Sequence, residues 1–431
     1  MHRTKVDSTV FLLAEGYTWA PGLLRRAGTD AVRTRLTGRP AVLIHGREAV
    51  RFFYDEQHVL RRGALPGPVL DTLFGRGAVH GLDGSEHRAR KRLFASLLMS
   101  AEGVAALTGR FEAAWADAVP GWAGRRVVLF DEVGTVLARA VCDWVGLPVP
   151  DDAAREIAED CIAMVDGFAT PGSRHWRARH ARRRQEEALA RAVLDVRGAG
   201  PHADGPFAPS RHHGVDRSAL AAVARHREAD GTLLPPHTAA VELLNIVRPT
   251  VALAWYTAFA AHALHRDPAQ RDRLRTAGFP YARAFAHELR RFYPFVPFVG
   301  GLAARDLRFG DVDIPAESLV LLDVYGHHHD PELWERPNRF DPGRFLGHEP
   351  DPAALIPQGA GDARTGHRCP GEDITLALLT AIAQTLAHLD FGVPQQDLSI
   401  PLHRIPTRPR SGFVMDDPRP SRSHAGRIAA R

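Results

Sequence analysis

Two short stretches of this sequence combine residue types that could do chemistry. The first is Arg248-Pro249, inside an apolar run from about 238 to 264. An arginine is almost never fully buried without an anionic partner, and a proline cannot donate to the helical hydrogen-bond ladder. These two costs at adjacent positions indicate either a structural accident or a binding site.

The second stretch is the glycine-rich loop 359–371, which contains Cys369 and precedes a predicted helix over about 373–389. A helix N-terminus stabilises a thiolate, and His367 and Arg368 add positive potential. No other cysteine lies nearby in the sequence, so a zinc ribbon or an iron–sulfur cluster fits poorly. A single thiolate ligand fits a haem iron.

Arg248 has no acidic neighbour on its own helix face, which carries Leu244, Asn245, Val251 and Ala252. Glu242 is six residues away, and we expect it to point elsewhere. The planar guanidinium holds a carboxylate through two parallel hydrogen bonds. That carboxylate comes either from a bound substrate or from an Asp or Glu in a distant segment. Pro249 predicts a local distortion of the helix.

The elements that must position these groups are mainly helical. Hydrophobic periodicity predicts helices through most of 101–197, over 280–292 and over 373–389, and a surface loop over 197–214. Short β-branched runs predict strands of small sheets at 41–44, 307–309, 312–314 and 319–322. We therefore expect a mainly α protein with one domain over 1–415 and a disordered polar tail over 416–431.

Composition excludes several classes of protein. Apolar residues make up 45% and charged residues 24%, and 55 basic against 50 acidic residues give a net charge of only +5, so nucleic acid is not an expected partner. Three cysteines indicate a reducing compartment. The run 238–264 is long enough to span a bilayer, but it contains Glu242, Asn245 and Arg248. We expect a soluble cytoplasmic protein without membrane insertion.

Three motifs in order resemble the cytochrome P450 superfamily: Glu288-Leu289-Arg290-Arg291, the stretch 337–345 (PNRFDPGRF) and the Cys369 loop. The resemblance covers essentially residues 7–415. It implies the cytochrome P450 fold, with haem b between the long central helix and the cysteine loop. It also implies that Cys369 is the axial iron ligand and that Glu288 and Arg291 form an ion-pair network with the 337–345 stretch.

One departure from the superfamily pattern is informative. Where that pattern has an acidic residue and a threonine, this chain reads Val247-Arg248-Pro249-Thr250, and its cysteine loop is longer than usual. Both departures, with the stretches 82–84, 356–359 and 411–415, resemble the fatty-acid peroxygenase branch. The resemblance implies hydrogen peroxide as oxidant, long-chain fatty acids as substrates and no redox partner protein. Oxidation at Cα or Cβ would give hydroxy acids, with possible decarboxylation to terminal alkenes.

The same resemblance assigns roles to individual residues. The catalytic set is Arg248, which anchors the substrate carboxylate, with Pro249 and His80; relatives carry Gln or His at the position of His80, and the histidine form resembles the decarboxylating enzymes. The candidates for haem propionate binding are Arg61, His87, Lys91 and His367. The candidates for the acyl channel are Phe74, Val79, Phe168 and Phe295.

Two other functions fit parts of the pattern. One is an NAD(P)H-dependent cytochrome P450 monooxygenase that uses redox partners, and the missing acid–threonine pair argues against it. The other is a haem-binding sensor or carrier without turnover, and an anchored carboxylate site over an open iron argues against that.

Overall fold

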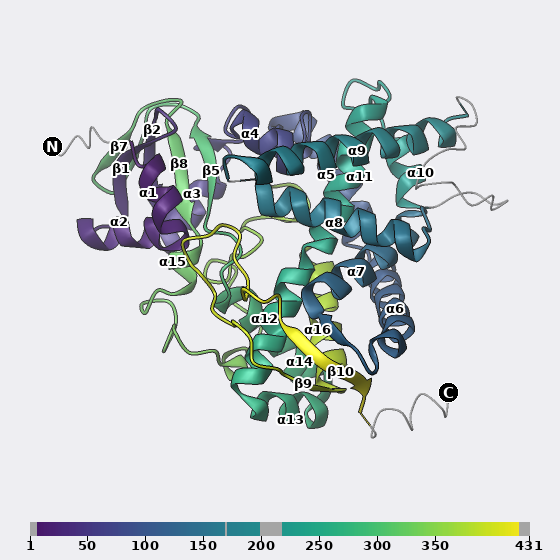
Figure 1. Cartoon of the computed structure of the whole chain (residues 1–431). Helices are drawn as coiled ribbons and strands as arrows, with labels where there is room; N and C mark the ends of the chain where they lie inside the picture. Colours follow the sequence, from purple (N-terminus) through teal and green to yellow (C-terminus); the bar gives the residue numbers. More distant parts are fainter. Residues whose placement is uncertain (1–6, 169, 199–217, 422–431) are drawn as a thin grey trace.

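The computed structural model describes residues 7–168, 170–198 and 218–421 of the 431-residue chain. In that part of the chain, helices form the larger region and a smaller β-rich region lies at one side (Figure 1). The helices are α1 (Thr9–Glu15), α2 (Trp19–Ala27), α3 (Arg47–Tyr54), α4 (Gly67–Val69), α5 (Gly84–Leu98), α6 (Ala101–Ala118), α7 (Leu129–Val145), α8 (Asp151–Gly167), α9 (Ser173–Val196), α10 (Ala219–Ala224), α11 (Pro236–Val251), α12 (Leu253–Arg266), α13 (Pro268–Thr276), α14 (Gly278–Phe292), α15 (Tyr325–His328) and α16 (Glu372–Ala387). Short helical turns are η1 (Gly16–Thr18), η2 (Leu70–Phe74), η3 (Val79–Gly81), η4 (Val119–Trp122) and η5 (Pro342–Phe345).

The strands form three small sheets. They are β1 (Ala31–Leu36), β2 (Arg39–Ile44), β3 (Val59–Leu60), β4 (Arg126–Val128), β5 (Phe298–Ala303), β6 (Leu307–Phe309), β7 (Val312–Ile314), β8 (Leu319–Asp323), β9 (Leu389–Gly392) and β10 (Val414–Pro420). The largest sheet has the order β1-β2-β8-β5-β3, in which only β2 and β8 are parallel. The others are β4-β10-β9 and the hairpin β6-β7.

The predicted mainly α architecture with small sheets is confirmed. The strands expected at 41–44, 307–309, 312–314 and 319–322 are present as β2, β6, β7 and β8. The polar tail was placed too early, because 416–420 belong to β10, which pairs with both β4 and β9. Residues 422–431, and 199–214 of the predicted surface loop, lie outside the described residues.

The long apolar run forms the centre of the helical region. Every residue from Ala239 to Val247 is buried, and so is every residue of α12 from Leu253 to Leu264. The run is two helices, because the ladder is interrupted at Ala252, three residues after Pro249. The distortion predicted from Pro249 is therefore confirmed, and it lies four residues after Arg248 in the chain.

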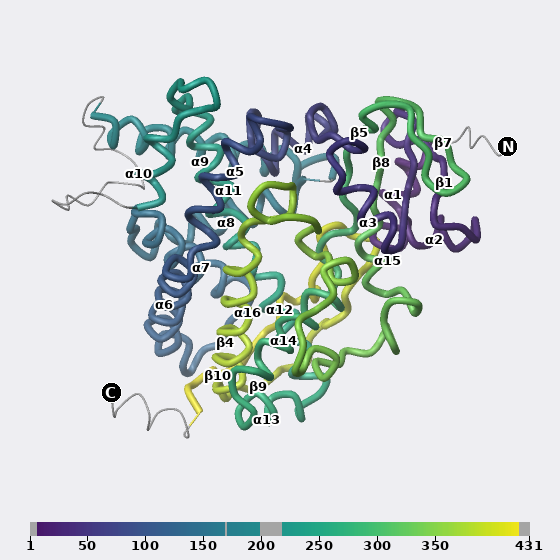
Figure 2. The backbone as a smooth tube through the Cα atoms, turned by 180° about the vertical axis from the view of Figure 1, so that it is seen from behind, coloured from purple at the N-terminus to yellow at the C-terminus, as the bar shows by residue number. Residues whose placement is uncertain are grey.

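Helix α16, which begins just after the cysteine loop, packs beside α12 and α14 (Figure 2). Its buried residues join the same apolar core as those of α11 and α12. The core therefore fixes the helix that carries Arg248 relative to the helix that follows Cys369. In the described ranges, no helix has the length and apolar character needed to cross a membrane.

A half-buried histidine joins the two parallel strands at their ends. His45, after β2, lies 3.5 Å through Nδ1 from Asp323 at the end of β8 and 3.0 Å through Nε2 from Asp330. Burial lowers the pKa of His45, but hydrogen bonds and attraction from the two carboxylates outweigh it and raise the pKa to about 9. Because the pKa of His45 is higher in the folded protein than in the unfolded protein, protonation of His45 stabilises the fold. This contribution is fully present below the unfolded-state pKa of about 6.5 and is lost as the pH rises through about 9.

We therefore expect His45→Gln to destabilise the protein more at about pH 6 than at about pH 9.5, by up to about 3 kcal/mol. Urea unfolding of wild type and variant at the two pH values measures the difference. An equal loss of unfolding free energy at both pH values would show that protonation of His45 adds nothing to the stability of the fold.

Candidate active site

The cysteine loop is held by polar contacts from two helices. The backbone N–H of Cys369 donates to the carbonyl of Gln358 over 2.9 Å. The side chain of Gln358 accepts from Arg290 of α14, which also pairs with Glu372 over 2.9 Å. Gly371 is the N-cap of α16 and lies next to the Cys369 sulfur, so the predicted place of the thiol at a helix N-terminus is confirmed.

Gly359, at the start of this loop, has a φ of +90°, and a Cβ there would lie 2.5 Å from the Tyr54 hydroxyl oxygen. Only glycine fits such a backbone conformation and such a close approach. The loop is thus fixed at its beginning by packing on α3 and at its end by α16.

The network expected around Glu288 and Arg291 is present and fully buried. Arg291 makes two 2.7 Å hydrogen bonds to the Glu288 carboxylate and donates to the carbonyls of His328 (2.7 Å) and Pro337 (2.9 Å). Glu288 also pairs with Arg344 over 3.2 Å. These contacts join α14 to the 337–345 stretch. The buried ion pair is tolerated because hydrogen bonds satisfy both of its partners.

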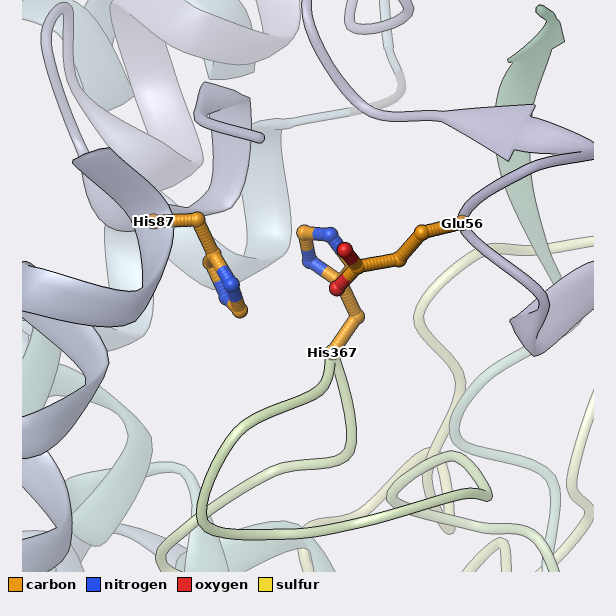
Figure 3. A group of neighbouring side chains, drawn as sticks. All are labelled: Glu56, His87 and His367. Atoms are coloured by element: carbon orange, nitrogen blue, oxygen red, sulfur yellow. The ribbon is translucent and has the colours of Figure 1, made fainter. Parts of the chain in front are cut away.

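A group of basic side chains faces the start of α5. His87 is 2% exposed, and its ring stacks on that of His367 with centroids 4.0 Å apart. Asp83 lies 3.4 Å from His367 Nε2 and accepts the backbone N–H of Arg61 over 2.9 Å. Glu56 completes the group, and its carboxylate and the two rings point toward one another (Figure 3).

Lys91 lies one helical turn from His87 and reaches the cysteine loop, where its ammonium group donates to the carbonyl of Arg368. Burial lowers the pKa of Lys91 to about 8, although Cys369 and Asp362 oppose this. Burial and the neighbouring His367 lower the pKa of His87 to about 3. The structure thus brings all four predicted propionate ligands, Arg61 included, to the region around Asp83 and the cysteine loop.

Arg248 is 7% exposed, and in the described part of the chain no carboxylate lies within ion-pair distance of it. Its one hydrogen bond is from Nη2 to Asn245 Oδ1, over 3.2 Å, and its Nε atom has no partner among the described residues. Burial, then the positive charge of Arg182, lowers the pKa of Arg248 to about 9. A buried guanidinium in this state is a ready site for a carboxylate.

The segment from Phe74 to His80 lies against Arg248. The Arg248 guanidinium carbon is 5.9 Å from the Phe74 ring centroid, and the rings of Phe74 and His80 are 4.6 Å apart. Burial and the charge of Arg248, followed by that of Lys91, lower the pKa of His80 to about 3, so its imidazole is neutral at pH 7. The Phe74 ring therefore lies between His80 and Arg248, with a contact to each.

The four acyl-channel candidates divide into two pairs. Phe74 lies beside Arg248, and Val79 lies beside Glu242, to which it donates its backbone N–H over 2.8 Å. Phe295 lies between α14 and β5 with its ring 5.1 Å from that of Tyr256, and Phe168 follows the end of α8. No ring contact or hydrogen bond in the described ranges joins Phe168 or Phe295 to Arg248.

The donor set was tested against the cofactor that the sequence implies. His80 Nδ1, His87 Nδ1, His367 Nε2 and Arg248 Nε are buried atoms without a hydrogen-bond partner among the described residues. His87 and His367, together with Lys91 and Arg61, suit two propionates, and the thiol at the N-terminus of α16 suits an iron ligand. The residues present fit haem, and the fold and site together define a haem-thiolate protein.

Comparisons with known proteins agree with a haem-thiolate protein. The sequence profile of the cytochrome P450 family matches residues 264–417. Cytochrome P450SP alpha (CYP152B1), solved with (R)-ibuprophen, is 40% identical over 96% of this chain and 99% of its own, with a TM-score of 0.89. Cytochrome P450EX alpha (CYP152N1), solved with myristic acid, is 33% identical over 97% of this chain and 98% of its own, with a TM-score of 0.89.

A variant of cytochrome P450 OleT, solved with arachidonic acid, is 33% identical over 97% of this chain and 98% of its own, with a TM-score of 0.90. Among curated sequences, cyclooctat-9-en-7-ol 5-monooxygenase of Streptomyces melanosporofaciens is 25% identical over 83% of this chain and 81% of its own length. Taurochenodeoxycholic 6 alpha-hydroxylase of Sus scrofa is 29% identical over 32% of this chain and 27% of its own length.

The chain belongs to the cytochrome P450 family, and its structural neighbours are CYP152 proteins. Its cofactor is haem with cysteine thiolate ligation. Cys142 and Cys161 are fully buried inside α7 and α8, which leaves Cys369 as the residue placed to supply the thiolate.

Sequence analysis missed the polar groups that support this site. Arg90 of α5 is 2% exposed and donates to Glu242, so the acid nearest to Arg248 in the helix has its own partner. Glu56 was also missed. Arg90 lies three residues from His87 on the same helix, a spacing that could have indicated a shared buried face.

Proposed function

We propose that the protein is a haem-thiolate peroxygenase that uses hydrogen peroxide to oxidise long-chain fatty acids at Cα or Cβ, as an oxidoreductase with peroxide as acceptor. The observation that carries the proposal is Arg248, a buried cation with no carboxylate partner in the described part of the chain. The neighbours solved with myristic and arachidonic acids support a fatty acid as its partner.

The substrate carboxylate has two tasks in this proposal. It accepts hydrogen bonds from the Arg248 guanidinium, which offsets the cost of burying both charges and fixes the head of the acid. It then performs the general acid–base work on the peroxide protons, since no protein acid stands in its place. Haem with its Cys369 thiolate supplies, when bound, the iron at which the peroxide bond is cleaved and the substrate oxidised.

Helix α11 lacks the proton-delivery groups that the superfamily pattern has at this place. Pro249 has no N–H, Thr250 commits its hydroxyl to the carbonyl of Ile246 over 2.9 Å, and Glu242 is paired with Arg90. None of these side chains is free to deliver a proton beside Arg248. This favours peroxide over the alternative, a redox-partner-dependent monooxygenase, which needs protons delivered to bound dioxygen.

Phe74 and Val79 give the first part of the acyl chain an apolar contact close to Arg248, and Phe168 and Phe295 are proposed to serve its more distant part. Arg61, His87, Lys91 and His367 are proposed to bind the haem propionates. No redox partner protein is required, because peroxide carries both oxidising equivalents.

The decisive test is incubation of the purified holoprotein with hydrogen peroxide and a saturated long-chain acid, with products identified by mass spectrometry. Hydroxy acids or terminal alkenes formed without a reductase support the proposal. Turnover only with NAD(P)H and redox proteins would favour the monooxygenase, and no turnover under either condition would favour a haem carrier.

His80 is proposed to influence which product forms, because it is a neutral imidazole beside the carboxylate anchor. Burial is the larger cause of the low pKa of His80 and the charge of Arg248 is the next, so a carboxylate bound at Arg248 would offset only the second. We expect His80→Gln to lower the alkene-to-hydroxy-acid ratio by about a hundredfold, the lower end of the effect of losing one proton-transfer group. Gas chromatography of the products measures it, and an unchanged ratio contradicts the role.

A further inference from the structure

The segment from Phe74 to His80 is fixed to the helices around it by buried polar contacts. Asn245 Nδ2 donates to the carbonyl of Phe74 over 3.0 Å, and Glu242 Oε1 accepts the N–H of Val79 over 2.8 Å. Between these points Gly75 has a φ of +85°, and a Cβ there would lie 2.2 Å from an Arg182 nitrogen. The segment that carries His80 is therefore held at both ends.

Glu242 is the group on which these contacts converge. It is fully buried, and Arg90 offsets its charge while also donating to the carbonyl of Gly77 over 3.3 Å. Arg90 in turn pairs with Glu228. A buried carboxylate with this many donors has a fixed position, because each lost partner would leave a buried charge or donor unsatisfied.

Asn245 connects Glu242 to the anchor arginine. Its Nδ2 donates to Glu242 Oε2 over 3.3 Å, and its Oδ1 accepts from Arg248 Nη2 over 3.2 Å. Because Glu242, Asn245 and Arg248 are three residues apart in turn on α11, they lie along one helix face. With its amide nitrogen directed to Glu242 and Phe74, Asn245 can present only its oxygen to Arg248.

We propose that Glu242 is a positioning residue that holds His80, through the Val79 N–H, and Arg248, through Asn245, in one fixed geometry. The inference rests on the proposed function, because it concerns how the anchored carboxylate meets His80. Glu242 acts through its neighbours and is not itself assigned a contact with substrate or haem. Its loss should therefore change how the acid is held and which product forms, with the haem site intact.

Glu242→Gln tests this with little change in size. Glutamine can still accept from the Val79 N–H, but it loses the charge that holds Arg90, and its NH₂ group cannot accept from Asn245. We expect the KM and Kd for a long-chain acid to rise by about threefold or more, and the alkene-to-hydroxy-acid ratio to change by a similar factor, as expected for a small misplacement. Haem content and the ferrous–CO band should be those of wild type.

Asp160→Asn is the matched control. Asp160 of α8 is 4% exposed and accepts from Arg184 and from Gln185, so the variant also loses a buried, paired carboxylate. Among the described residues it makes no hydrogen bond or ion pair with the 74–80 segment or with Arg248, so we expect a lower Tm with unchanged Kd and product ratio. If Glu242→Gln likewise lowers only the Tm, the role is structural and the inference is overturned.

The effect of Glu242→Gln on the product ratio should also depend on His80. In a His80→Gln background, Glu242→Gln should no longer change the product ratio, while the change in Kd that acts through Arg248 should persist. An undiminished effect on the ratio contradicts the route through Val79. If Glu242→Gln does not fold, Asn245→Ala interrupts the connection to Arg248 and keeps the Glu242–Arg90 ion pair, and the same Kd change is expected.

Acid binding, read from the Soret shift without peroxide, separates the two proposals. A wild type that binds the acid but does not turn it over with peroxide overturns the proposed function, and the Kd of the Glu242 variant still decides the inference. Peroxide-driven turnover in wild type with an unchanged Kd and product ratio in the variant overturns the inference alone.

Discussion

Replacing Arg248 with alanine is expected to abolish peroxide-driven oxidation of long-chain acids while haem remains bound. The guanidinium is the proposed partner of the substrate carboxylate, and it belongs to α11, away from the cysteine loop that holds the cofactor. Removing one partner of a buried charge pair costs about 2–5 kcal/mol, which corresponds to a loss of roughly 30-fold to several thousand-fold in kcat/KM.

Three comparisons make this prediction specific. Arg248→Lys keeps the charge but loses the planar fork, so an intermediate loss is expected. The methyl ester of the same acid should be a poor substrate for wild type, since it lacks the carboxylate. Arg275→Ala, which removes a partly buried arginine that donates to Ala387 from α13, should leave the kinetics unchanged. Wild-type turnover by Arg248→Ala would show that the carboxylate is held elsewhere.

The isolation of Arg248 could be predicted from the sequence because it depends on local geometry. Helical spacing shows that no acid lies three or four residues from Arg248, and among the described residues no carboxylate lies within ion-pair distance of it. The expectation that Glu242 points elsewhere was wrong in part, because Asn245 connects Glu242 to Arg248 along the same helix face. The partner of Glu242 could not be predicted in the same way. Arg90 lies 152 residues away in the chain, and only the packing of α5 against the rest of the fold brings the two together.

The interruption of the central helix and the position of the C-terminal tail could also be predicted only in part. Pro249 predicted a distortion, because a missing N–H is a local property, but the interruption falls at Ala252, three residues later. The tail was misplaced because 416–420 are polar, and composition describes side chains only. Backbone pairing with β4 and β9 and the ion pair between Arg126 and Asp416 make that segment a strand.

The cysteine ligand was predictable because its signal is chemical. A thiol beside a helix N-terminus is stabilised as the thiolate, which is the form that binds a metal. Burial raises the pKa of Cys369, and the N–H of Gly371 and the charge of Lys91 oppose that rise. The free thiol is thus protonated at neutral pH, and the charge of a bound iron completes its ionisation.

Cys369→Ala is therefore expected to eliminate the ferrous–CO Soret band typical of thiolate ligation, together with all turnover. Cys142→Ala is the control: it removes a thiol that is 0% exposed inside α7, whose pKa burial raises to about 12, and it should keep the band. If Cys369→Ala retained the band, the ligand would have to be one of two thiols enclosed within helices. Both thiols are 0% exposed inside α7 and α8, so retention of the band would contradict the assignment of Cys369 as the ligand.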